Sequence, residues 1–274
     1  MNARTAAGTA STWLFVPGDR PERFPKAAAA GADLVVLDLE DAVAPARKQD
    51  ARRNVVDWLA DHDAPCAVRI NAAGTPWYAD DVAALAGARP VVVMAPKSED
   101  VLTTNDLVRA LPEGSAVAAL VETALGVRRG HDLAAVEGVL RLVLGTYDLA
   151  AQLGVDPDHA PAIAPARGAL VLASAAVGLA GPVDGVTGDV HDADQLTADV
   201  SAAAAVGFAG KLCIHPAQVA PAAAALAPPE DEVAWAQRVL AATDDEGVVV
   251  VDGQMVDAPV VARARRIAAA ENHP

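Results

Sequence analysis

The chain has 274 residues, of which 53% are hydrophobic but only 3% aromatic, and its formal net charge is −15. This length suits one large α/β domain or two modest ones with a sizeable core. The acidic balance argues against a nucleic-acid surface or an anionic-membrane surface, because both need clustered positive charge. No segment approaches the ~18 apolar residues of a membrane helix. We therefore expect neither a nucleic-acid partner nor a membrane partner.

Two cysteines, Cys66 and Cys213, lie far apart in the sequence, inside apolar segments. Buried, reduced thiols are the simplest interpretation, and they are typical of the cytoplasm. The N-terminal segment carries one arginine and no long apolar stretch, so we predict no secretory signal. The expected location is the cytoplasm.

Short β-branched segments alternate with alanine-rich helical stretches along most of the chain, a pattern typical of parallel strands joined by crossover helices. Eight such units in about 220 residues predict a closed (β/α)₈ TIM barrel. The predicted strands are Trp13–Val16, Leu34–Leu39, Ala67–Ile70, Val91–Met94, Val117–Val121, Leu140–Leu144, Val183–Val186 and Lys211–Ile214. The predicted helices are Arg20–Ala30, Arg47–Ala60, Ala79–Leu85, Glu99–Ala110, Thr123–Gly130, Ala164–Ala180 and Ala193–Val206. An open doubly wound sheet is the alternative, but the turn after the first strand lacks GxGxxG.

The pattern changes after the eighth predicted strand. A helix is predicted over Glu230–Ala242 and another over Val260–Ala270. Between them, two short apolar segments (Gly247–Val251 and Gln254–Val256) around an Asp-Gly pair predict a hairpin or an irregular loop. These elements are not needed to close a barrel. We therefore predict a barrel domain over residues 1–220 and an extension over 221–274 that packs outside the barrel, on its own subunit or on a neighbouring one.

Charged and polar side chains follow nearly every predicted strand, at the barrel end where catalytic groups of this fold lie. They are Asp19, Arg20 and Arg23, then Asp38, Glu40 and Asp41, then Arg69, Lys97, Glu122, Tyr147, Asp148 and His215. Because the strands are parallel, these groups are expected to converge on one mouth.

Glu122 and Asp148 follow two strands that should be neighbours in the barrel. Two carboxylates together with water and substrate oxygens are ligands that Mg²⁺ accepts, so the pair predicts a magnesium site. Alternatively, Glu122 forms an ion pair with Arg69 or Lys97, and Asp148 caps the next helix. Zinc is disfavoured because the histidines are scattered and form no cluster with ligand spacing.

Arg69 and Lys97 are cations facing this acidic mouth. The guanidinium of Arg69 could hold a carboxylate or the oxygen of a developing enolate. Alternatively, the two cations only neutralise Asp38, Glu40 and Asp41. A Schiff-base role for Lys97 is disfavoured, because surrounding carboxylates would raise the pKa of its ammonium group.

Several short motifs occur in a characteristic order: Trp13–Phe24 (WLFVPGDRPERF), Leu37–Val43 (LDLEDAV), Val68–Asn71 (VRIN), Ala95–Lys97 (APK), Leu120–Thr123 (LVET), Asp148-Leu149, Lys211–Pro216 (KLCIHP) and Gly253–Pro259 (GQMVDAP). In these motifs the chain resembles the citrate lyase β-subunit-like proteins of the HpcH/HpaI aldolase/citrate lyase superfamily, near malyl-CoA and citramalyl-CoA lyases. The resemblance covers essentially the whole chain.

The resemblance implies a Mg²⁺-dependent carbon–carbon lyase. It would cleave a 3-hydroxyacyl-CoA such as malyl-CoA or citramalyl-CoA into acetyl-CoA and a 2-keto acid (glyoxylate, pyruvate or oxaloacetate). The implied roles are metal ligation by Glu122 and Asp148, catalysis by Arg69, Asp38, Glu40 and Asp257, and coenzyme A binding by Arg20, Arg23, Lys26 and His215. The family supplies the acid/base aspartate, here Asp257, from a neighbouring subunit, so a homotrimer or homohexamer is expected.

Two departures from the family pattern concern the predicted mouth. Gly145-Thr146-Tyr147 stands where many relatives carry a second acid, and Pro165 is expected to open the helix after the sixth strand. Three alternatives to the lyase are a malyl-CoA thioesterase with a malate-synthase-like site, a non-catalytic acyl-thioester-binding subunit, and a CoA-independent class II aldolase.

Overall fold

The computed structural model describes residues 3–242 and 249–271. The chain divides into two compact units, Met1–Ala223 and Ala224–Pro274.

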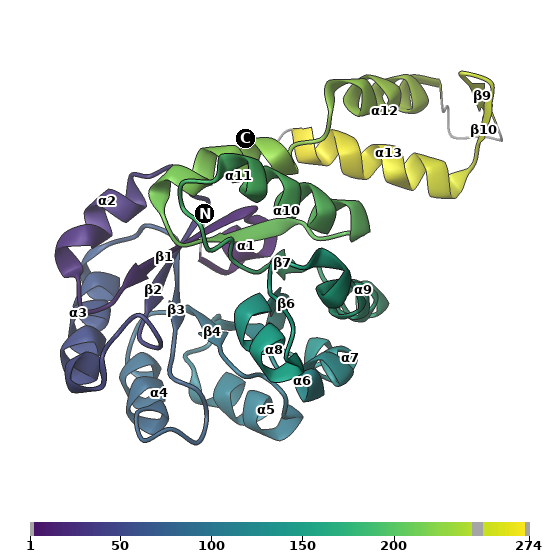
Figure 1. Cartoon of the computed structure of the whole chain (residues 1–274). Coiled ribbons are helices and arrows are strands. Elements are labelled where there is room, and N and C mark those ends of the chain that lie inside the picture. Colours follow the sequence, from purple (N-terminus) through teal and green to yellow (C-terminus); the bar gives the residue numbers. More distant parts are fainter. Residues whose placement is uncertain (1–2, 243–248, 272–274) are drawn as a thin grey trace. The chain divides into compact units, whose positions relative to one another are not determined.

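The first unit is built around a closed barrel of parallel strands in the order β1-β2-β3-β4-β5-β6-β7-β8 (Figure 1). The strands are β1 (Thr12–Pro17), β2 (Leu34–Asp38), β3 (Cys66–Arg69), β4 (Val92–Ala95), β5 (Ala116–Val121), β6 (Val139–Leu144), β7 (Val183–Asp184) and β8 (Gly210–Cys213). Each strand pairs with the next along the chain, and β1 closes the barrel by pairing with β8. The predicted (β/α)₈ barrel is confirmed, and the open sheet is wrong.

Helices surround the barrel, as Figure 1 shows. They are α1 (Ala3–Thr9), α2 (Phe24–Ala28), α3 (Lys48–Asp61), α4 (Tyr78–Ala86), α5 (Val101–Ala110), α6 (Ala124–Arg128), α7 (Gly130–Ala134), α8 (Thr146–Leu153), α9 (Ala160–Ala176), α10 (Ala193–Val206) and α11 (Val219–Leu226). Short 3₁₀ turns are η1 (Pro21–Arg23), η2 (Pro45–Arg47) and η3 (Pro216–Gln218).

Three predicted helices need correction. The stretch Arg20–Ala30 contains the 3₁₀ turn η1 and the short helix α2, which ends at Ala28. The stretch Thr123–Gly130 is divided between α6 and α7 at Arg129. The helix predicted from Ala164 begins four residues earlier, at Ala160, with Pro161 in its first turn, so Pro165 lies inside the helix and does not open it. The helix that directly follows β6 is α8, which the sequence analysis missed.

Side chains from all eight strands fill the barrel interior. The buried members of this core on the strands are Trp13, Leu34, Val36, Ala67, Val92, Met94, Ala118, Leu120, Val143, Val183 and Leu212. Because side chains alternate along a strand, Asp38 continues the inward row of β2. By the same alternation Arg69 continues the row of β3, and Glu122, one residue beyond β5, continues that of Leu120. The core pattern therefore aims three polar groups at the carboxyl end of the barrel axis.

The opposite end of the barrel is closed by α1, which the sequence analysis did not predict. Ala6 and Ala7 of this helix and the following Ala10 belong to the barrel core. Arg141 of β6, which is 1% exposed, donates hydrogen bonds to the carbonyl groups of Ala7, Gly8, Ala10, Gly181 and Ala209. Carbonyl groups at a helix C-terminus carry partial negative charge, so they partly compensate this buried cation.

The second unit contains α12 (Glu230–Ala242), the hairpin β9 (Val249–Val251) and β10 (Gln254–Val256), and α13 (Ala258–Glu271). The strands pair antiparallel, and Asp252 and Gly253 between them both have positive φ (51° and 78°), as an Asp-Gly hairpin turn requires. The predicted helix, hairpin and final helix are thus confirmed, although α13 begins two residues earlier than predicted. Gly247 and Val248, predicted in the first strand, lie outside the described residues.

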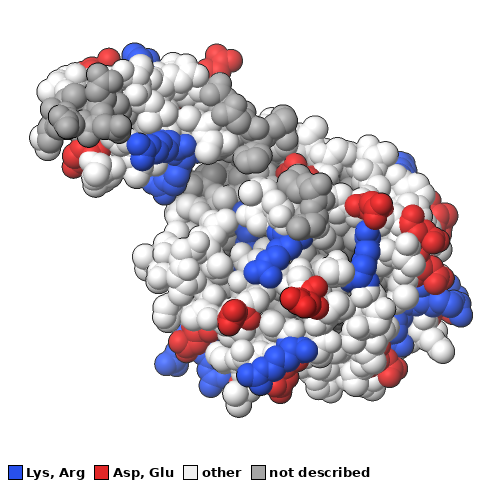
Figure 2. Space-filling view, turned by 180° about the vertical axis from the view of Figure 1, so that it is seen from behind, with Lys and Arg blue, Asp and Glu red and all other residues white. Residues whose placement is uncertain are grey.

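Charge is dispersed over the surface in the view of Figure 2. Lys and Arg side chains are interspersed with Asp and Glu on this face. Within the described residues, no helix is both long and apolar enough to cross a membrane.

Candidate functional site

A cavity of about 280 Å³ opens at the carboxyl end of the barrel strands. Its lining combines charged and apolar side chains. The lining residues are Phe15, Pro17, Asp38, Asp41, Ala42, Arg69, Leu120, Glu122, Leu144, Gly145, Thr146, Tyr147, Asp148, Val186, Leu212 and Ile214. The barrel thus brings six of the polar residues that follow the predicted strands to one cavity: Asp38, Asp41, Arg69, Glu122, Tyr147 and Asp148.

Arg69 is held in a bidentate ion pair with Asp38, with Nε and Nη2 donating to the two carboxylate oxygens at 2.7 Å each. Its Nη1 lies 3.0 Å from Oε2 of Glu40, and the guanidinium stacks 4.7 Å from the Phe15 ring centroid. Burial lowers the pKa of Arg69, but the carboxylates of Asp38, Glu40 and Asp41 raise it well above its usual range. The arginine is therefore permanently charged and fixed in orientation.

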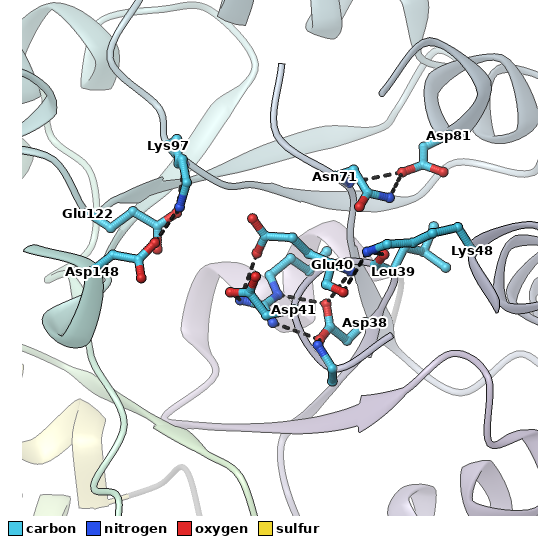
Figure 3. Close-up of polar contacts among 12 residues, drawn as sticks. Asp38, Leu39, Glu40, Asp41, Lys48, Asn71, Asp81, Lys97, Glu122 and Asp148 are labelled. Carbon is cyan, nitrogen blue, oxygen red and sulfur yellow. Dashed lines mark hydrogen bonds and ion pairs between the residues drawn. The ribbon is translucent and has the colours of Figure 1, made fainter. Parts of the chain in front are cut away.

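The loop after β2 is fixed by hydrogen bonds from two sides. The Asp38 carboxylate accepts from the backbone N–H of Glu40 at 2.9 Å and of Ala42 at 3.1 Å. The buried Nζ of Lys48, on α3, donates to the carbonyl groups of Leu39 and Glu40 at 2.7 Å each (Figure 3). Burial lowers the pKa of Lys48. This lysine holds the loop that carries the acids, a role the sequence analysis missed because helix Arg47–Ala60 was predicted only as a scaffold element.

Glu40 is buried, and its Oε2 accepts no hydrogen bond although Arg69 lies nearby. Burial raises the pKa of Glu40 to about 8; the charge of Arg69 lowers it, whereas Asp41, Glu122 and Asp38 raise it further. Burial thus favours the protonated form of this carboxyl, which can donate a hydrogen bond.

Glu122 and Asp148 form the second polar group of the mouth, with Lys97 between them (Figure 3). Oε1 of Glu122 accepts from the backbone N–H of Lys97 at 2.8 Å and lies 3.6 Å from Lys97 Nζ. Oδ2 of Asp148, in the first turn of α8, forms a hydrogen-bonded ion pair with the same Nζ. The two carboxylates therefore converge on one cation, and Glu122 pairs with Lys97, not with Arg69.

The pair fits a divalent metal ion. Burial raises the pKa of the Glu122 carboxyl and the nearby Lys97 opposes that rise, so this carboxylate benefits from a bound cation. Gly145 leaves room for it, because a Cβ there would lie 2.5 Å from Glu122 Oε2. Two oxygen donors with open positions match Mg²⁺, which retains several waters. Among the described residues there is no cluster of three or more His, Cys, Asp or Glu side chains that could form a full protein cage.

The remaining predicted residues lie away from this cavity's lining. Arg20 directly precedes η1, Arg23 is its last residue, and Lys26 is on α2. All three side chains are exposed. His215 is exposed, and its Nδ1 accepts from the backbone N–H of Ala217 at the start of η3. Their role in binding coenzyme A stays a prediction.

Asp257 belongs to the second unit. It directly precedes α13, and its Oδ1 accepts a hydrogen bond from the backbone N–H of Val260 at 3.3 Å. This contact is the turn or cap that an aspartate before Pro259 favours. The acid/base role of Asp257 stays a prediction.

A closed parallel barrel with a partly buried arginine and two convergent carboxylates at the carboxyl end of its strands has the architecture of a TIM-barrel enzyme. The chain belongs to the HpcH/HpaI aldolase/citrate lyase family, whose match spans residues 11–216. It is a lyase of this family.

Relatives match the chain over nearly its whole length. The chain is 42% identical to a citrate lyase subunit beta-like protein of Mycobacterium tuberculosis (96% of this chain, 95% of that protein). It is 36% identical to a (3S)-malyl-CoA thioesterase (92% and 91%) and 34% identical to an L-malyl-CoA/beta-methylmalyl-CoA lyase (93% and 92%), both of Cereibacter sphaeroides.

Among solved structures, CitE of M. tuberculosis in complex with magnesium, acetoacetate and coenzyme A matches with a TM-score of 0.84. The two sequences are 40% identical, and the match covers 96% of this chain and 99% of the CitE chain. The family resemblance read from the motifs is confirmed.

Proposed function

We propose that this protein is a Mg²⁺-dependent lyase that cleaves a 3-hydroxyacyl-CoA, such as malyl-CoA or citramalyl-CoA, into acetyl-CoA and a 2-keto acid. The observation that carries the proposal is the convergence of Glu122 and Asp148 on one cation position, in a cavity that Arg69 also lines. The magnesium and coenzyme A bound by the M. tuberculosis relative, and the malyl-CoA lyase of C. sphaeroides, support the cofactor and the substrate class.

Glu122 and Asp148 would hold the ion, and a bound Mg²⁺ would supply a Lewis acid for an oxygen of the 2-hydroxy or 2-keto fragment. Arg69 supplies the second positive charge. Its ion pair with Asp38 uses the N–H of Nε and one N–H of Nη2, which leaves further N–H groups to donate to an enolate oxygen. Because the guanidinium is already fixed, little reorganisation is needed when charge develops there.

Asp38 and Glu40 are proposed to act beside Arg69. Asp38 orients the guanidinium, which makes it a positioning residue. Burial favours the protonated form of Glu40, which would reduce the negative charge next to the arginine and leave more of its positive charge available for the substrate.

We propose that Asp257 of a neighbouring subunit, in a homotrimer or homohexamer, removes the hydroxyl proton in the cleavage direction and returns it in condensation. Arg20, Arg23, Lys26 and His215 are proposed to hold the phosphates of coenzyme A, for which exposed cations are suited. The proposed setting is the cytoplasm, supported by the buried unpaired thiols of Cys66 and Cys213.

A thioesterase is the second candidate, because the C. sphaeroides (3S)-malyl-CoA thioesterase is 36% identical over 92% of this chain. It would use the same carboxylates but let water reach the thioester carbonyl.

The test is a substrate panel with Mg²⁺: malyl-CoA, citramalyl-CoA, β-methylmalyl-CoA and free hydroxy acids, with keto acid and free thiol measured separately. The lyase predicts keto acid without thiol; thiol without keto acid would establish the thioesterase. We expect Glu122→Gln and Asp148→Asn to abolish turnover and to weaken the Mg²⁺ dependence of any residual activity. The matched control Glu113→Gln, on an exposed side chain, should retain both. Full activity of Glu122→Gln would contradict the assigned ligand pair.

A further inference from the structure

One lysine side chain occupies the point where the two proposed metal ligands meet. Nζ of Lys97 contacts Oδ2 of Asp148 and lies 3.6 Å from Oε1 of Glu122. Figure 3 shows the three side chains directed toward one another from separate segments of the barrel mouth. The position that a divalent ion would take therefore already contains a positive charge that belongs to the chain.

The backbone of Lys97 is arranged so that its side chain reaches this point. Its φ is +50°, and among the described residues only Asp252 shares a positive φ without being glycine. Such a conformation persists for a lysine only when neighbouring contacts hold it. The contacts are the Lys97 N–H donating to Glu122 Oε1 and the Ser98 N–H donating to the carbonyl of Leu120 at 3.0 Å. Backbone and side chain of one residue thus both bind the same carboxylate.

Glu122 and Lys97 differ in their exposure to water. Glu122 is 5% exposed and cannot move far, whereas the Lys97 side chain is 45% exposed on a flexible four-carbon stem. Without a cation between them, Glu122 and Asp148 would repel each other. A lysine that can swing into water can supply that cation and can also leave, at little desolvation cost.

We propose that Lys97 is a tethered occupant of the divalent-ion site, whose ammonium holds Glu122 and Asp148 together until a divalent cation replaces it. Ion binding is then an exchange of one cation for another, and Lys97 is a positioning residue that weakens the affinity of the site. The proposal rests on the proposed function only for the ligand pair Glu122 and Asp148.

The test measures Mn²⁺ binding directly, by electron paramagnetic resonance of the free ion, in the full-length protein without substrate. Removing the competing ammonium in Lys97→Met should tighten Mn²⁺ binding by about tenfold or more. Lys97→Arg keeps the positive charge, so its Mn²⁺ affinity should be closer to that of wild type. Arg109→Met removes one positive charge at the end of α5, outside the cavity lining, and should leave Mn²⁺ affinity unchanged.

A second variant separates the charge from the backbone conformation. Lys97→Gly removes the cation and relieves the positive φ, so it too should bind Mn²⁺ more tightly than wild type. Thermal unfolding gives a second readout: with EDTA Lys97→Met should melt below wild type, and Mg²⁺ should raise the melting temperature of both charge-removing variants more than that of wild type. This comparison also shows whether each variant is folded.

Two outcomes separate the cation exchange at Lys97 from the proposed function. If wild type binds Mn²⁺ in a manner that Asp148→Asn abolishes, yet neither Lys97→Met nor Lys97→Gly binds more tightly, the exchange is wrong and the proposed function stands. If wild type shows no Mn²⁺ site that depends on Glu122 and Asp148, both proposals are overturned.

Discussion

Gly145 packs directly against Glu122: a Cβ at residue 145 would lie 2.4 Å from the Cβ of Glu122 and 2.5 Å from its Oε2. Gly145 directly follows β6, and its backbone N–H donates to the carbonyl of Val121 at 2.9 Å. The glycine therefore defines the space that one proposed metal ligand occupies, without any positive φ of its own.

We expect Gly145→Ala to displace Glu122 and to reduce turnover by about a hundredfold or more, with weaker Mg²⁺ dependence. The matched control is Gly168→Ala, in the middle of α9, where a new Cβ would meet nothing within 4 Å. That control should keep its activity and gain about 0.5–1 kcal/mol in the free energy of unfolding. Steady-state kinetics and urea unfolding measure the two effects, and a fully active Gly145→Ala would contradict the assigned position of Glu122.

Arg69→Lys should lower kcat by about a hundredfold, because an ammonium group cannot reproduce the bidentate pair with Asp38 while also reaching the substrate. The loss should fall mainly on kcat and less on KM for the thioester, since the charge is proposed to act as the enolate forms. Kinetics with malyl-CoA and citramalyl-CoA measure this. An equal loss in every substrate's KM with kcat unchanged would assign Arg69 to ground-state binding instead.

The raised pKa of Glu40 predicts a pH dependence of stability. Its carboxyl titrates at about 8 in the folded protein and near its ordinary value of 4.5 in the unfolded chain. Between these values the folded state binds more protons, so this contribution to stability is complete below about pH 4.5 and is lost as pH rises through 8. The decline should approach about 1.4 kcal/mol per pH unit at most.

Urea unfolding of wild type and Glu40→Gln from pH 5 to pH 8, in EDTA, tests this dependence. Wild type should lose stability relative to the variant as pH rises, because glutamine does not titrate. Glu113→Gln, on an exposed side chain, serves as the control and should follow the wild-type curve. Parallel curves for wild type and Glu40→Gln would show that this carboxyl is ionised throughout the range.

Asp257→Asn should keep thioester binding within about threefold of wild type and lose most turnover, because the amide cannot accept the hydroxyl proton. Binding is measured by calorimetry with acetyl-CoA. If the aspartate acts in a neighbouring subunit, mixing Asp257→Asn with Glu122→Gln under conditions of subunit exchange should restore activity in sites that combine two intact residues. No restoration, although exchange is demonstrated, would place both groups in one subunit; wild-type turnover by Asp257→Asn would remove the acid/base assignment.

The strands and the polar mouth were predictable from the sequence because a parallel barrel imposes a simple rule. Rows such as Leu34, Val36 and Asp38 are apolar until the carboxyl end, where the alternation continues with a charged group. The ends of β3 and β5 follow the same rule with Arg69 and Glu122. The family resemblance then supplied roles that strand positions alone leave open.

The details of the mouth could not be predicted, because they depend on contacts between residues distant in the sequence. Lys97 lies 51 residues from Asp148, and the positive φ that aims its backbone N–H at Glu122 has no signature at a lysine. The role of Gly145 likewise depends on the rotamer of Glu122. Lys48 offered only a weak signal, as a lysine in a helix that follows the acidic loop.

The barrel end opposite the cavity depends on the N-terminal helix α1. Three of the carbonyl groups that Arg141 binds belong to Ala7, Gly8 and Ala10, and burial already lowers the pKa of Arg141 to about 10. A protein shortened by its first ten residues would keep that guanidinium enclosed by strands while losing these acceptors, and would admit water beneath Trp13. Helix α1 is therefore an integral part of the barrel domain. Removing it would destabilise the domain at the end opposite the cavity.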